Sequence, residues 1–306
     1  MKDFCMTEVL FCMVYNDSVC VKGVSEMDNK LVEKIRRFMD MPVTAGIVIT
    51  ILYTIVVKIV QKLVGGWGVL DMVMDIILVI SLIVIYIRYR KVFEDEIPDD
   101  PSAKTVLKGM IFVLPLMLHG LYGLVSSLRV MAVYGTEGIT PMYILSCTLK
   151  AVRAGVCEEI VLRGLFAGNM MRVNNKPKDI LMNAMIPSVV FGLVHFSNLI
   201  AGAGLYATIS QVLYATGIGF FLCIAYFRSG TVIPVIIAHA FFDLCSFISM
   251  AIETGVSNDV GVLADTSSAW EEVSSGLIVG AIYMAIGFFM YRKKKRADIC
   301  RIFRME

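Results

Sequence analysis

The chain has 306 residues, 58% of them apolar, and a formal net charge of +2. This apolar content is well above that of an average soluble domain and is typical of a polytopic membrane protein. The 8 cysteines are scattered, with no CxxC pair and no histidine at zinc-finger spacing. This spacing argues against a disulfide framework and against a zinc finger.

Apolar stretches long enough to cross a bilayer recur along the chain. A membrane-spanning helix needs about 20 mostly apolar residues, and eight stretches meet this length. They are residues 42–64, 68–88, 106–128, 142–170, 180–200, 205–227, 231–252 and 272–291. Thr140 and Pro141 supply an N-cap and a first-turn proline for the fourth stretch. The predicted fold class is therefore an all-α polytopic membrane protein with about eight transmembrane helices.

These stretches divide the chain into four parts. Residues 1–41 form a predicted cytosolic N-terminal segment, and residues 42–141 contain transmembrane helices one to three. Residues 142–252 contain helices four to seven, where most of the candidate functional residues lie. Residues 253–306 contain an outer loop, the last transmembrane helix and a basic cytosolic tail.

The distribution of Lys and Arg predicts the orientation in the membrane. The run 292–296 is strongly basic, the loops near 88–91 and 172–178 are also basic, and the loop 253–271 has no Lys or Arg. Eight spans counted back from the basic tail place both termini in the cytoplasm. We therefore predict an integral, multi-pass protein of the plasma or cell membrane. Because this topology explains the basic tail, no nucleic-acid partner is expected.

The first of three polar clusters inside the predicted spans consists of Glu158, Glu159 and Arg163. Charges in hydrocarbon are costly unless they pair or take part in function. Glu159 and Arg163 are four residues apart, so on a helix they share a face and can form an ion pair. Glu158 points about 100° away and has no such partner, which makes it a candidate to accept a proton from water. The alternative is a purely structural ion pair between helices.

The other two clusters are histidines with polar neighbours. Asn198 follows His195 by three residues on the same helix face, and Asp243 follows His239 by four. At the second spacing the carboxyl group can orient the imidazole. The alternatives are a hydrogen-bonded core histidine and a hydrogen bond between helices.

Depth in the membrane relates the clusters to one another. At about 1.5 Å per residue, Glu158, His195, His239 and Asp243 lie between roughly 12 and 22 Å from the cytosolic ends of their spans. We therefore expect them to share one layer near mid-membrane, reached through a cavity that faces the cytosol.

Three motifs in this order resemble the CAAX-protease and bacteriocin-processing family of intramembrane proteases. They are EExxxR (Glu158, Glu159, Arg163), FxxxH (Phe191, His195) and HxxxD (His239, Asp243). The similar segment covers roughly residues 142–250. The resemblance implies a CAAX-protease-like helical core over 142–252. It also implies endoproteolysis of membrane-associated peptides near their C-termini or leader junctions.

The same resemblance implies roles for the motif residues. Glu158 and His195 would activate the attacking water, and His239 and the residue at position 243, here Asp243, would stabilise the oxyanion. Glu159 and Arg163 would brace the site.

Asp243 occupies a position where the family commonly has Asn, with Asp as a recurrent alternative. An Asn amide can donate to an oxyanion, whereas an ionised Asp cannot. Asp243 is therefore either kept protonated by burial, or it holds His239 as the donor. We favour the second interpretation because of the four-residue spacing.

Metal use and function class are the remaining alternatives. Two histidines and a glutamate could hold zinc with an open fourth position, but there is no HExxH motif. Although the family is often labelled as metalloproteases, the resemblance fits a glutamate-based mechanism without a cofactor at least as well. We expect a membrane-associated peptide or protein substrate, possibly prenylated or leader-bearing. The alternatives are a non-catalytic scaffold or bacteriocin-immunity protein on the same fold, and a transporter that uses the carboxylates as relays.

Ionisable residues outside the motifs are predicted to be structural. Asp71 or Asp75 can pair with Lys150 or Arg153 across helices, and His119 is expected to be a core or cavity residue.

Overall fold

The computed structural model describes residues 22–64, 68–93, 96–97, 101–134, 139–260 and 268–305. These residues form helices and connecting turns, without strands. Residues 1–21 of the predicted N-terminal segment and residues 261–267 of the predicted outer loop lie outside the described residues.

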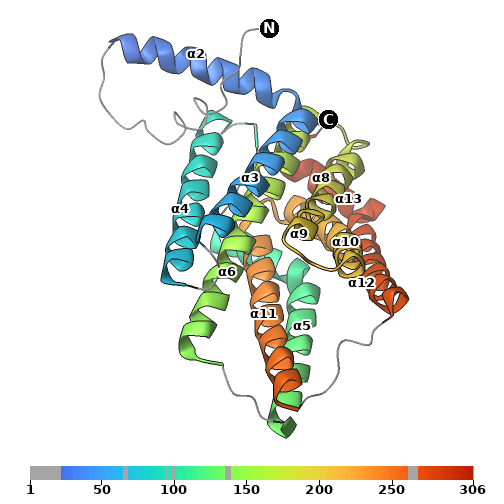
Figure 1. Cartoon of the computed structure of the whole chain (residues 1–306). Coiled ribbons are helices and arrows are strands. Elements are labelled where there is room, and N and C mark those ends of the chain that lie inside the picture. The colour runs from blue at the N-terminus through green and yellow to red at the C-terminus, as the bar shows by residue number, and fades with distance from the viewer. Residues whose placement is uncertain are drawn as a thin grey trace.

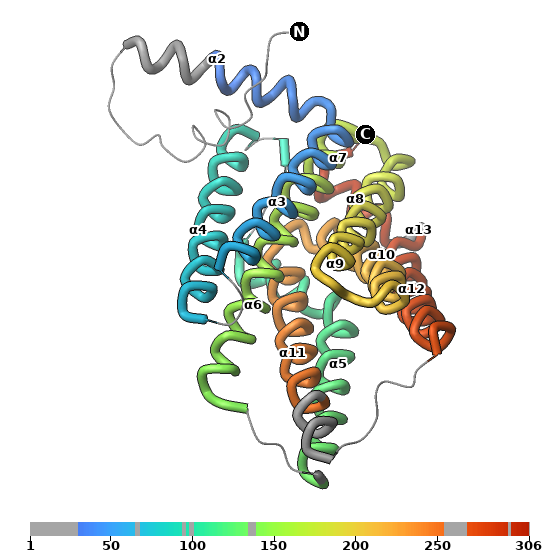
Figure 2. Tube along the Cα trace, in the orientation of Figure 1, coloured from blue at the N-terminus to red at the C-terminus, as the bar shows by residue number. Residues whose placement is uncertain are grey.

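The helices follow one another in the order that Figures 1 and 2 trace by colour. They are α2 (Lys22–Met39), α3 (Pro42–Val64), α4 (Val69–Val92), α5 (Ala103–Tyr134), α6 (Pro141–Glu159), the π-helix η1 (Ile160–Ala167), α7 (Gly168–Val173), α8 (Ile180–Val194), α9 (Ser197–Ile200), α10 (Leu205–Ser229), α11 (Ile233–Val260), α12 (Ala269–Tyr291) and α13 (Lys293–Ile302).

Seven segments of the described chain are long and apolar enough to cross a membrane. They are Pro42–Val64, Val69–Val92, Ala103–Val133, Ile180–Ile200, Leu205–Ser229, Ile233–Glu253 and Ala269–Tyr291. Each coincides with a predicted span. Large apolar side chains such as Ile55, Ile59 and Leu63 on α3 are exposed on the outer surface, as contact with lipid requires. The protein is an integral, multi-pass membrane protein with an all-helical fold.

The predicted fourth span differs from the other seven. Residues 141–173 form the consecutive helices α6, η1 and α7, roughly 48 Å of helix at 1.5 Å per residue. Thr140 caps this run by accepting a hydrogen bond from the Tyr143 backbone N–H, and Pro141 occupies the first turn, as predicted. The run is less apolar than the seven because it carries the charged residues of the first motif. All eight residues of η1 are buried, so protein rather than lipid surrounds this part.

Polar contacts gather several helix ends at one end of the bundle. The Asn169 side chain donates to the backbone O of Met39 at 2.7 Å, and Arg172 pairs with Asp40 at 2.8 Å and with Glu96 at 2.9 Å. These contacts join α7 to the turn between α2 and α3 and to the turn after α4. Helix α2 and the C-terminal part of α13 lie at this end in Figures 1 and 2.

Most of the basic residues near helix ends lie at the end of the bundle where Asn169 and Arg172 form these contacts. We call it the basic end, and we call the opposite end of the bundle the far end. Arg36 forms an ion pair with Glu96 at 2.6 Å. Burial raises the pKa of Glu96, but the hydrogen bonds from Arg36 and Arg172 outweigh burial and lower this pKa. The basic end is therefore fastened by ion pairs between α2, α4 and α7.

Two ion pairs join α4 to α6 within the bundle. Lys150 pairs with Asp71, and Arg153 pairs with Asp75 at 2.6 Å. Both aspartates are buried. This confirms the predicted scaffold contacts between these helices.

Candidate active site

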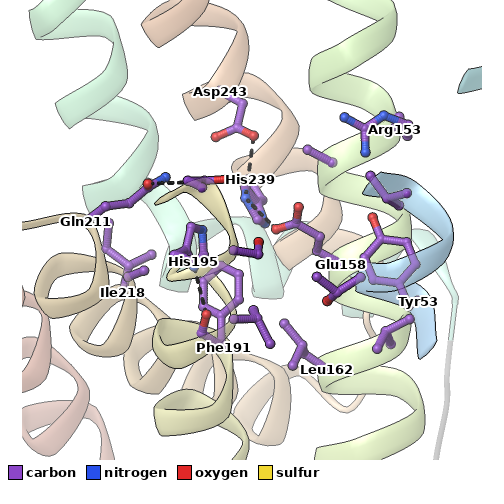
Figure 3. Close-up of a pocket in the computed structure, with 18 of the residues that line it drawn as sticks. Tyr53, Arg153, Glu158, Leu162, Phe191, His195, Gln211, Ile218, His239 and Asp243 are labelled. Carbon is purple, nitrogen blue, oxygen red and sulfur yellow. Dashed lines mark hydrogen bonds and ion pairs between the residues drawn. The ribbon is translucent and has the colours of Figure 1, made fainter. Parts of the chain in front are cut away.

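The three sequence motifs meet where α6, α8 and α11 approach one another. Glu158 and Glu159 end α6, His195 follows α8, and His239 and Asp243 lie on α11. Figure 3 shows Glu158 pointing toward His239, with His195 on the neighbouring wall and Asp243 one turn along α11. Residues far apart in the sequence are thus brought into one site.

Glu159 and Arg163 form a buried ion pair behind the site. Their side chains are 2.7 Å apart and almost completely inaccessible to solvent. Arg163 also donates to the backbone O of Gly219 at 3.2 Å, and its guanidinium lies 5.0 Å from the centroid of the Phe191 ring. The predicted pairing is confirmed, and Glu158 is left facing the other way, into a cavity.

A π-helix begins directly after the two glutamates. In η1 each backbone hydrogen bond joins residues five apart, whereas in an α-helix it joins residues four apart. This arrangement is often found at functional sites. Sequence analysis did not predict this turn, because the apolar residues 160–162 suit an α-helix equally well.

His239 is held by Glu159. Its Nδ1 lies 2.6 Å from Glu159 Oε1, so this N–H donates to the carboxylate. The other nitrogen, Nε2, lies 3.6 Å from Asp243 Oδ2 and 3.9 Å from Glu158 Oε2. That Asp243 holds His239 stays a prediction, because the ring contacts both carboxylates and the contact to Glu159 is the shorter one. The shorter bond to Glu159 fixes the ring, and Asp243 faces the nitrogen that points toward the cavity.

His195 is oriented by its own helix. Its Nδ1 lies 2.8 Å from the backbone O of Phe191 and donates to it. In the neutral imidazole this leaves the lone pair on Nε2. The Phe191 ring packs edge-on against the rings of both His195 and His239. The FxxxH motif thus supplies the contact that holds the two imidazoles in place.

The site opens into a cavity of about 320 Å³. Glu158, His195, His239 and Asp243 all line it, whereas Glu159 does not. Within the described residues, these side chains share the cavity as predicted.

The cavity extends toward the far end. Its lining residues reach Gln61, three residues from the end of α3, and Gln61 and Ser246 are exposed. Toward the basic end the lining ends at buried residues such as Leu162 and Ile218. Leu162 lies eleven residues before the end of α7, and Ile218 lies eleven residues before the end of α10. The cavity therefore opens away from the basic end, in contrast to the expected opening on the basic, cytosolic side. Depth along separate helices could not show which end is closed by packing.

Several lining residues had no motif to mark them. Tyr53, Lys58 and Gln61 come from α3, Gln211 from α10, and Arg153 from α6. Polar side chains at intervals on otherwise apolar helices were the available signal. His119, expected to be a core or cavity residue, is half-buried and does not line this cavity; its Nδ1 lies 3.0 Å from the Tyr283 hydroxyl.

The zinc alternative depends on how the His, Cys, Asp and Glu side chains are grouped. Zinc needs at least three converging protein ligands. In the described part of the chain, no three His, Cys, Asp or Glu side chains are grouped so that they could hold a metal ion. These described side chains therefore do not supply the three converging ligands that the zinc alternative needs.

This arrangement defines a class of protein, an all-helical membrane protein with a glutamate–histidine site enclosed by its helices. Residues 140–245 match the family model named Rce1-like, described as type II CAAX prenyl endopeptidase Rce1-like. This segment is an Rce1-like domain and contains every motif residue, so the family resemblance is confirmed. The family that this model describes is one of CAAX-type membrane endopeptidases. Searches among curated proteins and among solved structures found no match.

Proposed function

We propose that this protein is an intramembrane endopeptidase in which Glu158 activates water without a metal cofactor. The observation that carries the proposal is that Glu158, His195 and His239 line one cavity inside the Rce1-like domain. Among the described residues, the Glu158 carboxylate forms no hydrogen bond, and its contact with Nε2 of His239 is 3.9 Å long. The carboxylate is therefore available to a water molecule.

The proposed reaction is hydrolysis of a peptide bond. Glu158 takes one proton from water, and Nε2 of His195 accepts a hydrogen bond from the other hydrogen. The resulting hydroxide attacks the peptide carbonyl carbon and forms a tetrahedral oxyanion. Glu158 then gives its proton to the amide nitrogen, the C–N bond breaks, and an acid and an amine are released.

His239 is the proposed oxyanion donor. It faces three carboxylates, Glu158, Glu159 and Asp243, and their attraction favours the imidazolium form, which has an N–H on both nitrogens. Glu159, itself held by Arg163, fixes Nδ1 so that Nε2–H points into the cavity. Glu159 and Arg163 therefore act as positioning residues.

The substrate is proposed to be a membrane-associated peptide or protein, possibly prenylated or leader-bearing. A site enclosed by helices in the bilayer serves chains that enter from the membrane. By the positive-inside rule, we place the basic end and both termini in the cytoplasm, and the cavity then opens to the opposite side of a plasma or cell membrane.

The test is cleavage of prenylated and unprenylated fluorogenic peptides by purified protein in detergent. Glu158→Gln is expected to lower kcat/KM by about 10²- to 10⁴-fold, since it removes the general base, with the melting temperature unchanged. Wild type should retain activity after treatment with a chelator; loss of activity would indicate zinc instead.

Two other functions predict different results. A scaffold or immunity protein on this fold would cleave no peptide, and its cellular effect would survive Glu158→Gln. A proton or ion transporter would support uptake into liposomes, and that uptake would survive His195→Ala.

A further inference from the structure

Arg228 is a buried arginine that has no carboxylate partner. It lies in the last turn of α10, at the basic end, and is 8% exposed. Arg153 and Arg163 are also buried, and each of them pairs with a carboxylate. Among the described residues, Arg228 forms neither an ion pair nor a hydrogen bond, and its guanidinium lies 4.2 Å from the centroid of the Phe112 ring on α5. An unpaired cation inside a membrane protein is costly and indicates a functional site.

Lys108 on α5 lies beside this arginine. Gly109 packs against the turn that follows α10, since a Cβ added there would lie 3.0 Å from Cβ of Ser229. Lys108 precedes Gly109 and lies one helical turn before the aromatic ring that Arg228 covers, so lysine and ring share a face of α5. Lys108 is exposed and forms no ion pair within the described part of the chain. The two cations thus lie close together between α5 and the end of α10.

The neighbouring helix α13 carries an acidic residue, Asp298, but this residue has a different partner. Asp298 pairs with Arg301 at 3.6 Å and forms no ion pair with Arg228. The positive charge of Arg228 and Lys108 therefore remains available to an anion from outside the chain.

The surface of α5 next to Lys108 is apolar and exposed. Leu107 and Ile111 are 69% and 67% exposed, and Leu114 follows at 47%. Their three- and four-residue spacing places them in one stripe, which runs along α5 away from the basic end. A small free anion would contact none of this stripe, whereas the acyl chains of a lipid would cover it.

The depth of Lys108 also suits a lipid head group. The span Ala103–Val133 is roughly 46 Å long at 1.5 Å per residue, which is about the thickness of a bilayer with both headgroup regions. Lys108 is five residues from the start of α5, about 7.5 Å along its axis. Each headgroup region is about 5–8 Å thick, so Lys108 lies at its inner boundary.

We propose that Arg228 and Lys108 bind the phosphate of an anionic phospholipid in the leaflet at the basic end. Nε of Arg228 is buried, which leaves the terminal nitrogens of the guanidinium to donate to phosphate oxygens. The ring of Phe112 holds the guanidinium in place, and Lys108 adds a second charge. Basic pockets between transmembrane helices bind lipid head groups in this way. Neither cation lines the catalytic cavity, so the lipid site does not depend on the proposed cleavage reaction.

The experiment measures lipid binding by the full-length protein in detergent. Native mass spectrometry of delipidated protein gives the Kd of the first bound phosphatidylglycerol and, separately, of the first bound phosphatidylcholine with the same acyl chains. Both lipids contain a phosphate, but only phosphatidylglycerol has a net negative charge. We expect wild type to bind phosphatidylglycerol about 10- to 30-fold more tightly, because two cations near the membrane surface face the head group.

Lys108→Gln is expected to weaken phosphatidylglycerol binding about fivefold, and Arg228→Gln about tenfold, without a change in phosphatidylcholine binding. Arg228→Lys keeps the charge and should restore part of the preference. Lys34→Gln is the matched control, because Lys34 is exposed on α2 and forms no ion pair among the described residues; its Kd should equal that of wild type. Because Lys108 is exposed, its substitution decides the test even if Arg228→Gln does not fold.

Three results would overturn the proposal. Equal binding of the two lipids, or a preference that survives both Lys108→Gln and Arg228→Gln, would show that these residues do not form the site. An equal loss in Lys34→Gln would show a general effect of surface charge. Displacement of phosphatidylglycerol by an equal concentration of inorganic phosphate would assign the two cations to a free anion instead of a lipid.

Discussion

At the residue scale, the two carboxylates near His239 have different tasks. Glu159 is buried, bonded to Arg163, and 2.6 Å from Nδ1 of His239. Asp243 lies 3.6 Å from Nε2 and lines the cavity. Glu159 therefore fixes the His239 ring. Asp243 places a carboxyl group beside Nε2, the nitrogen that would face an oxyanion. Asp243 is thus the more replaceable of the two.

Asp243→Asn is expected to keep cleavage activity within about tenfold of wild type, because one weak contact of about 0.5–1.5 kcal/mol is altered. The Asn amide can also donate to an oxyanion. His239→Ala is expected to lose about 10²- to 10³-fold, as removal of an oxyanion donor does. Initial rates on one fluorogenic peptide compare the variants, after gel filtration shows that each is folded. An inactive Asp243→Asn protein would show that the carboxylate itself is required.

At the element scale, the site depends on how closely α6 approaches α11. A Cβ added at Gly155 would lie 2.7 Å from both Cβ and the backbone N of Ala240. This is closer than nonbonded atoms can come, so glycine allows the helix approach that brings Glu158 and Glu159 to His239. The π-helix follows immediately and continues the run past Arg163. Local backbone features therefore set the geometry of the candidate site.

Gly155→Ala is expected to destabilise the fold by about 1–3 kcal/mol, the usual cost of overpacking. It should also lower cleavage activity, because α11 must move away from α6. Thermal unfolding in detergent and the peptide assay measure the two effects. The matched control is Gly123→Ala on α5, where the added Cβ has open space; helix propensity predicts a stabilisation of up to about 1 kcal/mol there. Equal effects of the two substitutions would contradict the role given to Gly155.

At the scale of the whole molecule, the helices separate a closed end from an open one. Ion pairs and hydrogen bonds between α2, α4 and α7 fasten the basic end. The cavity begins deeper in the bundle and reaches exposed residues only toward the far end. If the basic end is cytoplasmic, substrate enters from the other side of the membrane or from its outer leaflet.

Cysteine labelling tests this orientation. In a background whose accessible native cysteines are replaced by serine, Gln61→Cys marks the far end and Lys178→Cys marks the basic end; both positions are exposed. A membrane-impermeant maleimide is expected to label Gln61→Cys in intact cells, and Lys178→Cys only after permeabilisation. The reverse pattern would place the cavity mouth in the cytoplasm.

Features that depend on residues close together in the chain could be predicted from the amino-acid sequence. The lengths of the apolar stretches predicted seven membrane-spanning helices that the structure confirms. The four-residue spacing of Glu159 and Arg163 predicted their ion pair. The order of the motifs on successive spans predicted the family. Each of these follows from helix periodicity or from the cost of exposing polar groups to lipid.

The way in which the helices meet could not be predicted from the sequence, because it depends on packing between distant parts of the chain. The shortest contact of His239 is to Glu159, 80 residues away, and not to its neighbour Asp243, and Lys58 bonds to Asn198, 140 residues away. The direction in which the cavity opens likewise depends on which helix ends pack tightly. Such contacts are set by crossing angles and close approaches between helices, as at Gly155 and Ala240. Periodicity along one helix carries no information about them, because it specifies which face is buried but not against what.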